Sequence, residues 1–342
     1  MSIDVHCHLT GGEYQRAGGL SAVLSRAREA GVTACICSGF DLPSSAAAAG
    51  LAEKHDLICV VRSQSHADTI NNNGIVISEK DGTTRTARVK AVTDTRDLKP
   101  FDLVLIAVKA PSTEEAVQTH CALFGKDTVA VTLQNGYGNH ADIEAVANPD
   151  RIIIGTTAQG ANMSSDGRVN HAGSGGTTIG ALHPQAPDAK NLLDSVSVLF
   201  SEAGFETVIT SDAEDAVIRK LFVNIGINAV CALNDCANRF ISENPEMRRY
   251  SRQLIDEAVA VFEAAGRSYD GEKIWEHVES VAKATGDNFC SMVQDLRKGR
   301  PTEIKKINGV VVQLADERNI AAPFNREITQ KIENISLKKS RS

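Results

Sequence analysis

The sequence predicts an α/β domain built on a parallel sheet, followed by a second domain that is entirely helical. In roughly the first two hundred of the 342 residues, short β-branched runs alternate with helical stretches, which is typical of βαβ units. After about Asp212, apolar residues recur at three- and four-residue spacing, as in long amphipathic helices. The boundary between the two patterns lies near residues 210–215.

The α/β part contains strand-like runs, helix-like runs and two hairpin-like interruptions. Several strands are continuous apolar runs, as expected of a sheet covered on both faces. The predicted strands are 3–8, 32–37, 57–61, 103–108, 128–133 and 151–155. The predicted helices are 20–30, 44–55, 113–123 and 140–146. The predicted hairpins are 75–92, which contains the turn pair Asp81-Gly82, and the Gly-, Ser- and Asn-rich stretch 160–180.

Four long helices are predicted in the second half, at 213–233, 245–265, 271–284 and 303–318. The most apolar run, 221–233, is too short to span a bilayer, and it contains two Asn and a Gly. The first residues lack the basic and apolar segments of a signal peptide, so we expect a cytoplasmic protein without a membrane partner.

Charge and composition argue against nucleic acid as the main partner. The formal net charge is −7 and only 4% of the residues are aromatic, so neither a basic surface nor a base-stacking platform is indicated. The eight cysteines form no CxxC pair and no disulfide framework. They are therefore interpreted as reduced core thiols.

Three segments place polar residues inside an otherwise apolar pattern. The first contains Lys220, Asn224 and Asn228, which lie on one face of a predicted helix because they are four residues apart. A Lys among apolar neighbours is costly without a function, so we favour a ligand site over the alternative, a polar groove between helices.

The second segment runs from Ser291 through Asp295 to Gly299-Arg300, and continues to Thr302-Glu303. Thr302 is predicted to cap a helix that begins at Glu303. By itself this segment fits a helix–turn–helix junction as well as it fits a site.

The third segment, Gln134-Asn135-Gly136-Tyr137-Gly138-Asn139, directly follows a predicted strand. Ligands of open parallel sheets bind at the carboxyl ends of the strands, so this segment is a candidate binding loop. An ordinary βα turn is the alternative.

Together the three segments resemble the 2-dehydropantoate 2-reductase (ketopantoate reductase) family. That family has a strand-end QNG turn, a K-x-x-x-N-x-x-x-N helix and an S-M-x-Q-D-x-x-x-G-R-x-T-E-I segment, which all occur here in order. Val61-Arg62 with the following His66, and Ala107-Val108-Lys109 at a strand end, match as well. The resemblance covers about residues 56–333. It implies a Rossmann-like NADP-binding domain over 56–211 and an all-helical substrate domain over 212–335.

The resemblance also implies roles for residues of this chain in the NADPH-dependent reduction of a 2-keto acid. Lys220 would be the general acid that protonates the carbonyl oxygen, and Glu303 would anchor the substrate hydroxyl and adjust Lys220. The substrate-binding residues would be Asn224, Asn228, Ser291 and Asp295, and the cofactor-binding residues would be Arg62, Lys109, Asn135 and Glu303. Arg62 would pair with the 2′-phosphate of NADP. A homodimer is compatible with this interpretation.

Residues 1–55 do not match that family. They resemble the opening of TatD-type metal-dependent hydrolases, in which an H-x-H pair on the first strand binds metal; the pair here is His6 and His8. The later ligands of such a site are missing from the sequence, so no metal site is predicted. The segment instead partly replaces the first βαβ unit of the cofactor domain.

The junction lies near His55-Asp56, and the family's G-x-G-x-x-G turn is missing. In the family's register its three glycines fall on Ser38, Phe40 and Pro43, where a pyrophosphate would need a close backbone. The leading hypothesis is a ketopantoate reductase with an altered cofactor site. The alternatives are a chimeric protein with little or no catalytic activity and, less favoured, a metal-dependent hydrolase.

Overall fold

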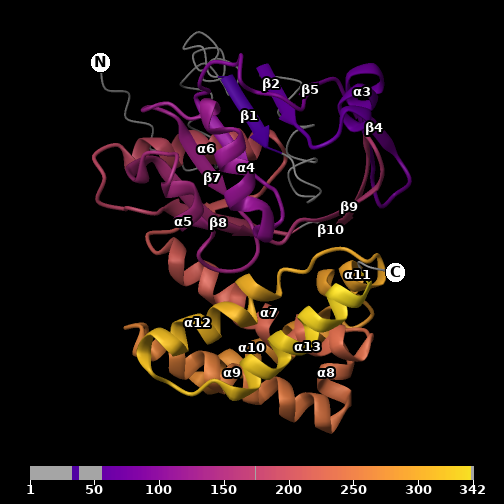
Figure 1. Cartoon of the computed structure of the whole chain (residues 1–342), viewed down its shortest axis with the longest axis vertical. Coiled ribbons are helices and arrows are strands. Elements are labelled where there is room, and N and C mark those ends of the chain that lie inside the picture. Colours follow the sequence, from indigo (N-terminus) through magenta and orange to yellow (C-terminus); the bar gives the residue numbers. More distant parts are fainter. Residues whose placement is uncertain (1–32, 38–55, 174, 340–342) are drawn as a thin grey trace, which may run out of the picture. The chain divides into compact units, whose positions relative to one another are not determined.

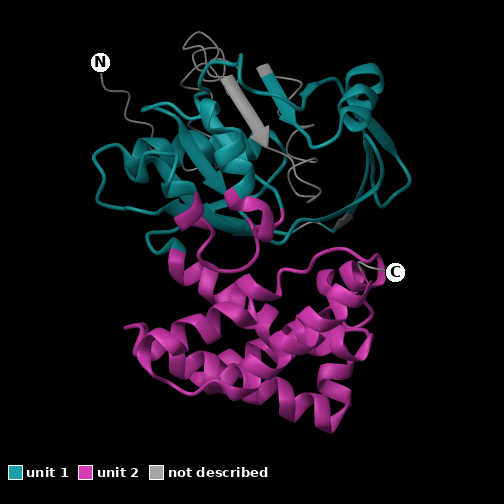
Figure 2. Ribbon diagram, viewed as in Figure 1, with its two compact units in different colours: residues 1–108, 115–133, 143–213 teal, residues 109–114, 134–142, 214–342 magenta. Residues whose placement is uncertain are grey.

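The computed structural model describes residues 33–37, 56–173 and 175–339. These residues form two compact units (Figure 2). The α/β unit holds the described residues up to Val108, together with Glu115–Leu133 and Ile143–Ala213. The helical unit holds Glu214 onward and two short segments from the first half of the chain, Lys109–Glu114 and Gln134–Asp142. The predictions for 3–8, 20–30 and 44–55 lie outside the described residues.

The main sheet of the α/β unit has eight strands in the order β12-β11-β8-β7-β6-β1-β2-β5. Figure 1 labels β1, β2, β5, β7 and β8 of this sheet. All neighbouring pairs from β5 to β8 are parallel, and β11 is antiparallel to β8. The strands are β1 (Thr33–Cys37), β2 (Asp56–Val60), β5 (Lys90–Val92), β6 (Leu103–Ile106), β7 (Val129–Thr132), β8 (Ile152–Thr157), β11 (Thr177–Ala181) and β12 (Thr207–Ile209).

This strand order is that of a dinucleotide-binding fold. If β1 is counted first, the described strands β5-β2-β1-β6-β7-β8 have the order 3-2-1-4-5-6. The prediction of a Rossmann-like sheet is therefore confirmed, and β1 occupies the central position. The four residues of β6 and of β7 are all buried, as expected for parallel strands covered on both faces.

A second, four-stranded sheet of the α/β unit has the order β4-β3-β10-β9. The predicted hairpin at 75–92 is confirmed only for β3 and β4, which pair antiparallel around Asp81-Gly82. The prediction was wrong for β5, which pairs parallel with β2 in the main sheet. Within 160–180, β9 and β10 form the hairpin and β11 joins the main sheet. The bounds are β3 (Ile75–Ser78), β4 (Thr84–Ala87), β9 (Gly160–Ser165) and β10 (Arg168–Gly173).

Helices pack on the main sheet of the α/β unit and share its core. α6 packs against β11 and β12, and its Val196 and Phe200 join a buried cluster that includes Val131 and Ile153. Each fully buried side chain of this size stabilises the fold by roughly 1.5–3 kcal/mol. The helices between and after these strands are α3 (Gln64–Asn73), η1 (Ala110–Ser112), α4 (Thr113–Thr119), η2 (Cys121–Leu123), α5 (Asn139–Glu144), η3 (Pro149–Arg151) and α6 (Ala189–Glu202).

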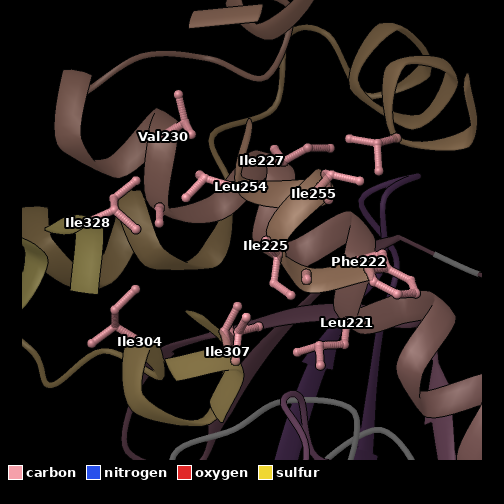
Figure 3. Packing of buried hydrophobic residues seen from close by; sticks show 14 of the residues in the cluster. Leu221, Phe222, Ile225, Ile227, Val230, Leu254, Ile255, Ile304, Ile307 and Ile328 are labelled. Carbon is pink, nitrogen blue, oxygen red and sulfur yellow. The ribbon is translucent and has the colours of Figure 1, made fainter. Parts of the chain in front are cut away.

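The helical unit is built around α7, whose apolar residues point into a buried cluster (Figure 3). Leu221, Phe222 and Ile225 of α7 pack there with residues of α9, η4 and α13. The elements are α7 (Ala213–Asn234), α8 (Phe240–Glu243), α9 (Pro245–Ala264), α10 (Gly271–Ala284), α11 (Ser291–Arg297), η4 (Ile304–Lys306), α12 (Asn308–Arg318) and α13 (Pro323–Lys339). Three of the four predicted helices, α7, α9 and α10, begin at the predicted residue.

The fourth predicted helix, 303–318, was wrong at its beginning. Residues 304–306 form a short 3₁₀ turn, and α12 begins at Asn308. Ile307 between them has φ −109° and ψ −90°, which is not helical, so one continuous helix is excluded. The predicted Thr302 cap was wrong as well, because the N-cap positions of η4 and α12 are Glu303 and Ile307, and neither helix has a side-chain cap hydrogen bond.

α7 is long and apolar enough, by length and composition, to cross a membrane. However, 61% of its most apolar window is buried inside the protein, as in the core helix of a globular fold. Gly226 shows how closely α7 is packed, because a Cβ at this position would lie 2.7 Å from Val278 Cγ1 of α10. Ser251 of α9 donates a hydrogen bond of 2.6 Å to the Gly226 carbonyl. The helix is therefore fixed by close contacts with α9 and α10.

Candidate active site

Helix α7 carries the three polar residues of the first motif. Lys220, Asn224 and Asn228 lie on one face, because α7 is continuous over the whole segment. Lys220 and Asn224 are half-buried, and Asn228 is 7% exposed. Leu221 and Ile225 lie on the buried side of the same helix. The helix thus presents an ammonium group and two amides from a rigid support.

The segment after β7 forms a tight loop whose backbone requires glycine. Gly136 and Gly138 have φ values of +88° and +82°. A Cβ on Gly136 would lie 2.6 Å from the carbonyl oxygen of Lys306, which is too close for any side chain. The same carbonyl accepts a hydrogen bond of 2.9 Å from the Tyr137 backbone. The loop is therefore held directly against the η4 turn.

Side chains add two further attachments of this loop within the helical unit. The Tyr137 hydroxyl donates to Glu214 at the beginning of α7, and Arg267 donates to the other oxygen of that carboxylate. Burial raises the pKa of Tyr137, and the Glu214 carboxylate raises it further, so the hydroxyl stays a donor. Lys306 Nζ lies 3.2 Å from the Asp142 carboxylate. The loop is thus tied to both α7 and η4.

Glu303 lies just before η4 and is 5% exposed. Its Oε1 accepts a hydrogen bond from the Ala110 backbone N–H, and its Oε2 accepts one from Asn135 Nδ2, both at 3.3 Å. An ionised carboxylate only accepts hydrogen bonds, so the Asn135 amide must turn its nitrogen toward Glu303. The segments after β6 and β7 therefore each supply one donor to this buried acid.

Asp295 of α11 is buried between two cations. Lys109, from the segment after β6, forms an ion pair with one oxygen, and Arg300 Nε lies 3.3 Å from the other. The Lys109 side chain is largely buried as well. Both cations thus offset the cost of burying this carboxylate. Ser291 is the exposed first residue of the same helix.

Arg62 belongs to the α/β unit, where it directly follows β2 and is exposed to solvent. The nearby His66 is half-buried; burial lowers its pKa, an effect that Asp166 partly opposes. Ser38–Pro43 and the pair His6 and His8 lie outside the described residues. Within the described ranges, no group of three or more His, Cys, Asp or Glu residues could hold a metal ion.

The structure joins two pairs of predicted site residues by direct contacts, Lys109 with Asp295 and Asn135 with Glu303. The sequence did not single out several groups that hold these pairs in place: the Ala110 backbone, Tyr137, Glu214, Arg267, Arg300 and Lys306. A backbone N–H leaves no sequence signal. Tyr137 and Arg300 lie inside predicted motifs, and a tyrosine within a glycine-rich turn was the available indication in the sequence.

The comparisons with known proteins agree on one family. The model described as "Ketopantoate reductase PanE/ApbA" matches residues 44–184, and the model described as "Ketopantoate reductase PanE/ApbA C terminal" matches residues 212–336. A 2-dehydropantoate 2-reductase of Halobacterium salinarum is 37% identical over 266 residues, which cover 77% of this chain and 85% of the relative.

Solved structures show the same fold. A ternary structure of D-mandelate dehydrogenase with NADH and anilino(oxo)acetate has a TM-score of 0.84 at 22% identity, and the match covers 90% of this chain and 100% of the other. A dimeric ketopantoate reductase from Staphylococcus aureus has a TM-score of 0.72 at 21% identity, with the same coverage.

Proposed function

The chain belongs to the ketopantoate reductase family, and we propose that it reduces 2-dehydropantoate to (R)-pantoate, the step that serves pantothenate and coenzyme A synthesis. The observation that carries the proposal is the pairing of Asn135 with Glu303 in the unit that also presents Lys220, Asn224 and Asn228. An acid, an ammonium group and several amides in one unit suit a small polar keto acid.

The described residues fit a nicotinamide dinucleotide. In the chain, Arg62 comes after β2, Lys109 after β6 and Asn135 after β7, and each of these strands is parallel to its neighbours. Dinucleotide-binding folds use the segments that follow such strands. Because Asn135 turns its nitrogen toward Glu303, its Oδ1 is left as an acceptor for a ribose hydroxyl. The exposed guanidinium of Arg62 suits the 2′-phosphate of NADP. NADPH, when bound, supplies the hydride.

The protein groups have separate tasks in this reaction. Lys220 donates a proton to the carbonyl oxygen of the keto acid while the adjacent carbon is reduced. Asn224, Asn228 and Ser291 hold the hydroxyl and carboxylate ends of the substrate. Glu303 accepts the hydrogen bond of the substrate hydroxyl and adjusts Lys220. Asp295, through its ion pairs with Lys109 and Arg300, fixes the orientation of α11.

The test is oxidation of NADPH by the purified full chain with 2-dehydropantoate, followed by absorbance. We expect saturable turnover that is lost in Lys220→Ala. NADPH binding is measured separately by calorimetry. Binding without turnover would support the chimeric, non-catalytic alternative, and absence of binding would show that Ser38–Pro43 cannot replace the glycine turn.

We further propose a homodimer in the cytoplasm. The dimer is suggested by the relative from Staphylococcus aureus, whose structure is described as dimeric. Sedimentation of the purified chain tests this: a single species at the mass of one chain over a range of micromolar concentrations would contradict it.

A further inference from the structure

The end of helix α7 brings two cysteines together. Asp235 follows the helix with φ +48°, and the Cys236 backbone N–H donates to the Cys231 carbonyl at 3.1 Å. This is the six-to-one hydrogen bond of a Schellman motif, in which the residue after the left-handed one touches the residue five positions earlier. That contact is usually between two apolar side chains, and here both are cysteines.

The Cys231 and Cys236 thiols interact electrostatically, and Cys290 interacts with both. Cys231 Sγ lies 3.8 Å from the Ala237 carbonyl oxygen, which belongs to the residue directly after Cys236. Cys290 Sγ lies 3.5 Å from the Asn228 carbonyl oxygen. Cys231 is buried, whereas Cys236 is half-buried and thus the more accessible member of the pair. The mechanism described above uses none of these thiols.

We propose that Cys231 and Cys236 are a site of reversible oxidation, which hydrogen peroxide converts into a disulfide bond. In the first step the Cys236 sulfur attacks one peroxide oxygen, the O–O bond breaks, and a sulfenic acid and one water form. In the second step the Cys231 sulfur attacks the sulfenic sulfur, the S–O bond breaks, and a second water leaves. Two thiols lose two hydrogens while one peroxide is reduced to two waters.

The surroundings of the thiols set the pH dependence of the first step. Burial raises the pKa of Cys236, and the neighbouring Asp235 carboxylate raises it further, against the lowering effect of the Cys231 thiol. Burial raises the pKa of Cys290 to about 11, with Asp295 adding to the effect. Arg297 forms an ion pair with Asp235 at this turn. Because the thiolate reacts, oxidation is slow at neutral pH and accelerates about tenfold per pH unit below the thiol pKa.

The sequence allows a direct test by peptide mass. Trypsin releases residues 221–239, which contain Cys231 and Cys236, and residues 284–297, which contain Cys290. The full-length protein is treated with hydrogen peroxide at several pH values between 7 and 9, then denatured, alkylated and digested. We expect peptide 221–239 to lose two hydrogens and carry no alkyl group, faster at higher pH, while Cys290 stays alkylated. A thiol reductant should restore two alkylation sites.

Matched variants assign the bond. Cys236→Ser should leave Cys231 alkylated after peroxide, whereas Cys121→Ser, at an exposed cysteine of the α/β unit, should leave the result unchanged. A doubly alkylated peptide 221–239 at pH 9 would overturn the proposal. So would a cross-link between peptides 221–239 and 284–297, or a sulfinic acid on Cys236. The measurement on the unmodified protein does not depend on the folding of a variant.

Discussion

The segments that follow β6 and β7 differ from the one that follows β2, although all three come from the carboxyl ends of parallel strands. The segments after β6 and β7 belong to the helical unit. There Lys109 binds the Asp295 carboxylate. The Ala110 backbone and Asn135 bind the Glu303 carboxylate. Arg62, after β2, remains in the α/β unit with its side chain in solvent. The first group therefore binds buried carboxylates of the helical unit, whereas Arg62 is exposed, and ligand selection is the role proposed for it.

The largest effect on catalysis is expected from Lys220→Ala. Loss of the proton donor should reduce kcat by about 10³-fold, within the usual range for general acid catalysis. Because Lys220 is only half-buried, the melting temperature should stay close to that of the wild type. A single-turnover rate constant within threefold of the wild-type value would remove Lys220 from the mechanism.

Gly136→Ala should destabilise the protein by about 3 kcal/mol, since a left-handed backbone strain adds to a clash with the Lys306 carbonyl. Gly138→Ala is the matched control. It has a similar positive φ but open space around the added Cβ, so we expect a loss of about 1 kcal/mol. Urea unfolding measures both. Equal losses would show that the contact with η4 does not hold the loop.

Lys109→Met should lower the free energy of unfolding by about 2 kcal/mol, because it leaves a buried carboxylate with one cation fewer. The loss should fall short of that for a fully isolated charge, since Arg300 remains beside Asp295. Combining Lys109→Met with Asp295→Asn in a double-mutant cycle measures the coupling. Additive losses would mean that the ion pair contributes nothing.

Arg62→Ala should have the smallest effect and the most selective one. NADPH affinity should fall by about tenfold with loss of the phosphate contact, while NADH affinity and stability stay unchanged. Calorimetry with both cofactors separates the outcomes. An equal loss for NADH would indicate that Arg62 acts on the sheet rather than on the phosphate.

The spacing of apolar residues predicted α7, α9 and α10 well, because an apolar stripe specifies a helix wherever no distant group binds the backbone of that segment. The prediction that a helix begins at Glu303 was wrong because the Lys306 carbonyl binds a group outside the helix. Lys306 O accepts from Tyr137 N rather than from the next helical turn, and Ile307 leaves the helical conformation. That competitor is more than 160 residues away in sequence, so no local pattern could indicate it.

The candidate site residues also divide into a group that local sequence could predict and pairs that it could not. Lys220, Asn224 and Asn228 were predictable as a group since one helix carries them. The pairs Lys109–Asp295 and Asn135–Glu303 are separated by 186 and 168 residues, and the resemblance supplied their membership in a site but not their contacts. Only the fold brings them together.

The discontinuous make-up of the helical unit limits how this protein can be divided. A fragment cut at Ala213/Glu214 would keep Lys220 and Glu303 yet lose Ala110 and Asn135, the two donors on the Glu303 carboxylate. It would also lose Lys109, which pairs with Asp295, and keep the pairing of Arg300 with that carboxylate. For expression or domain exchange with a relative, the transferable catalytic part is therefore the helices together with two loops encoded in the first half of the chain.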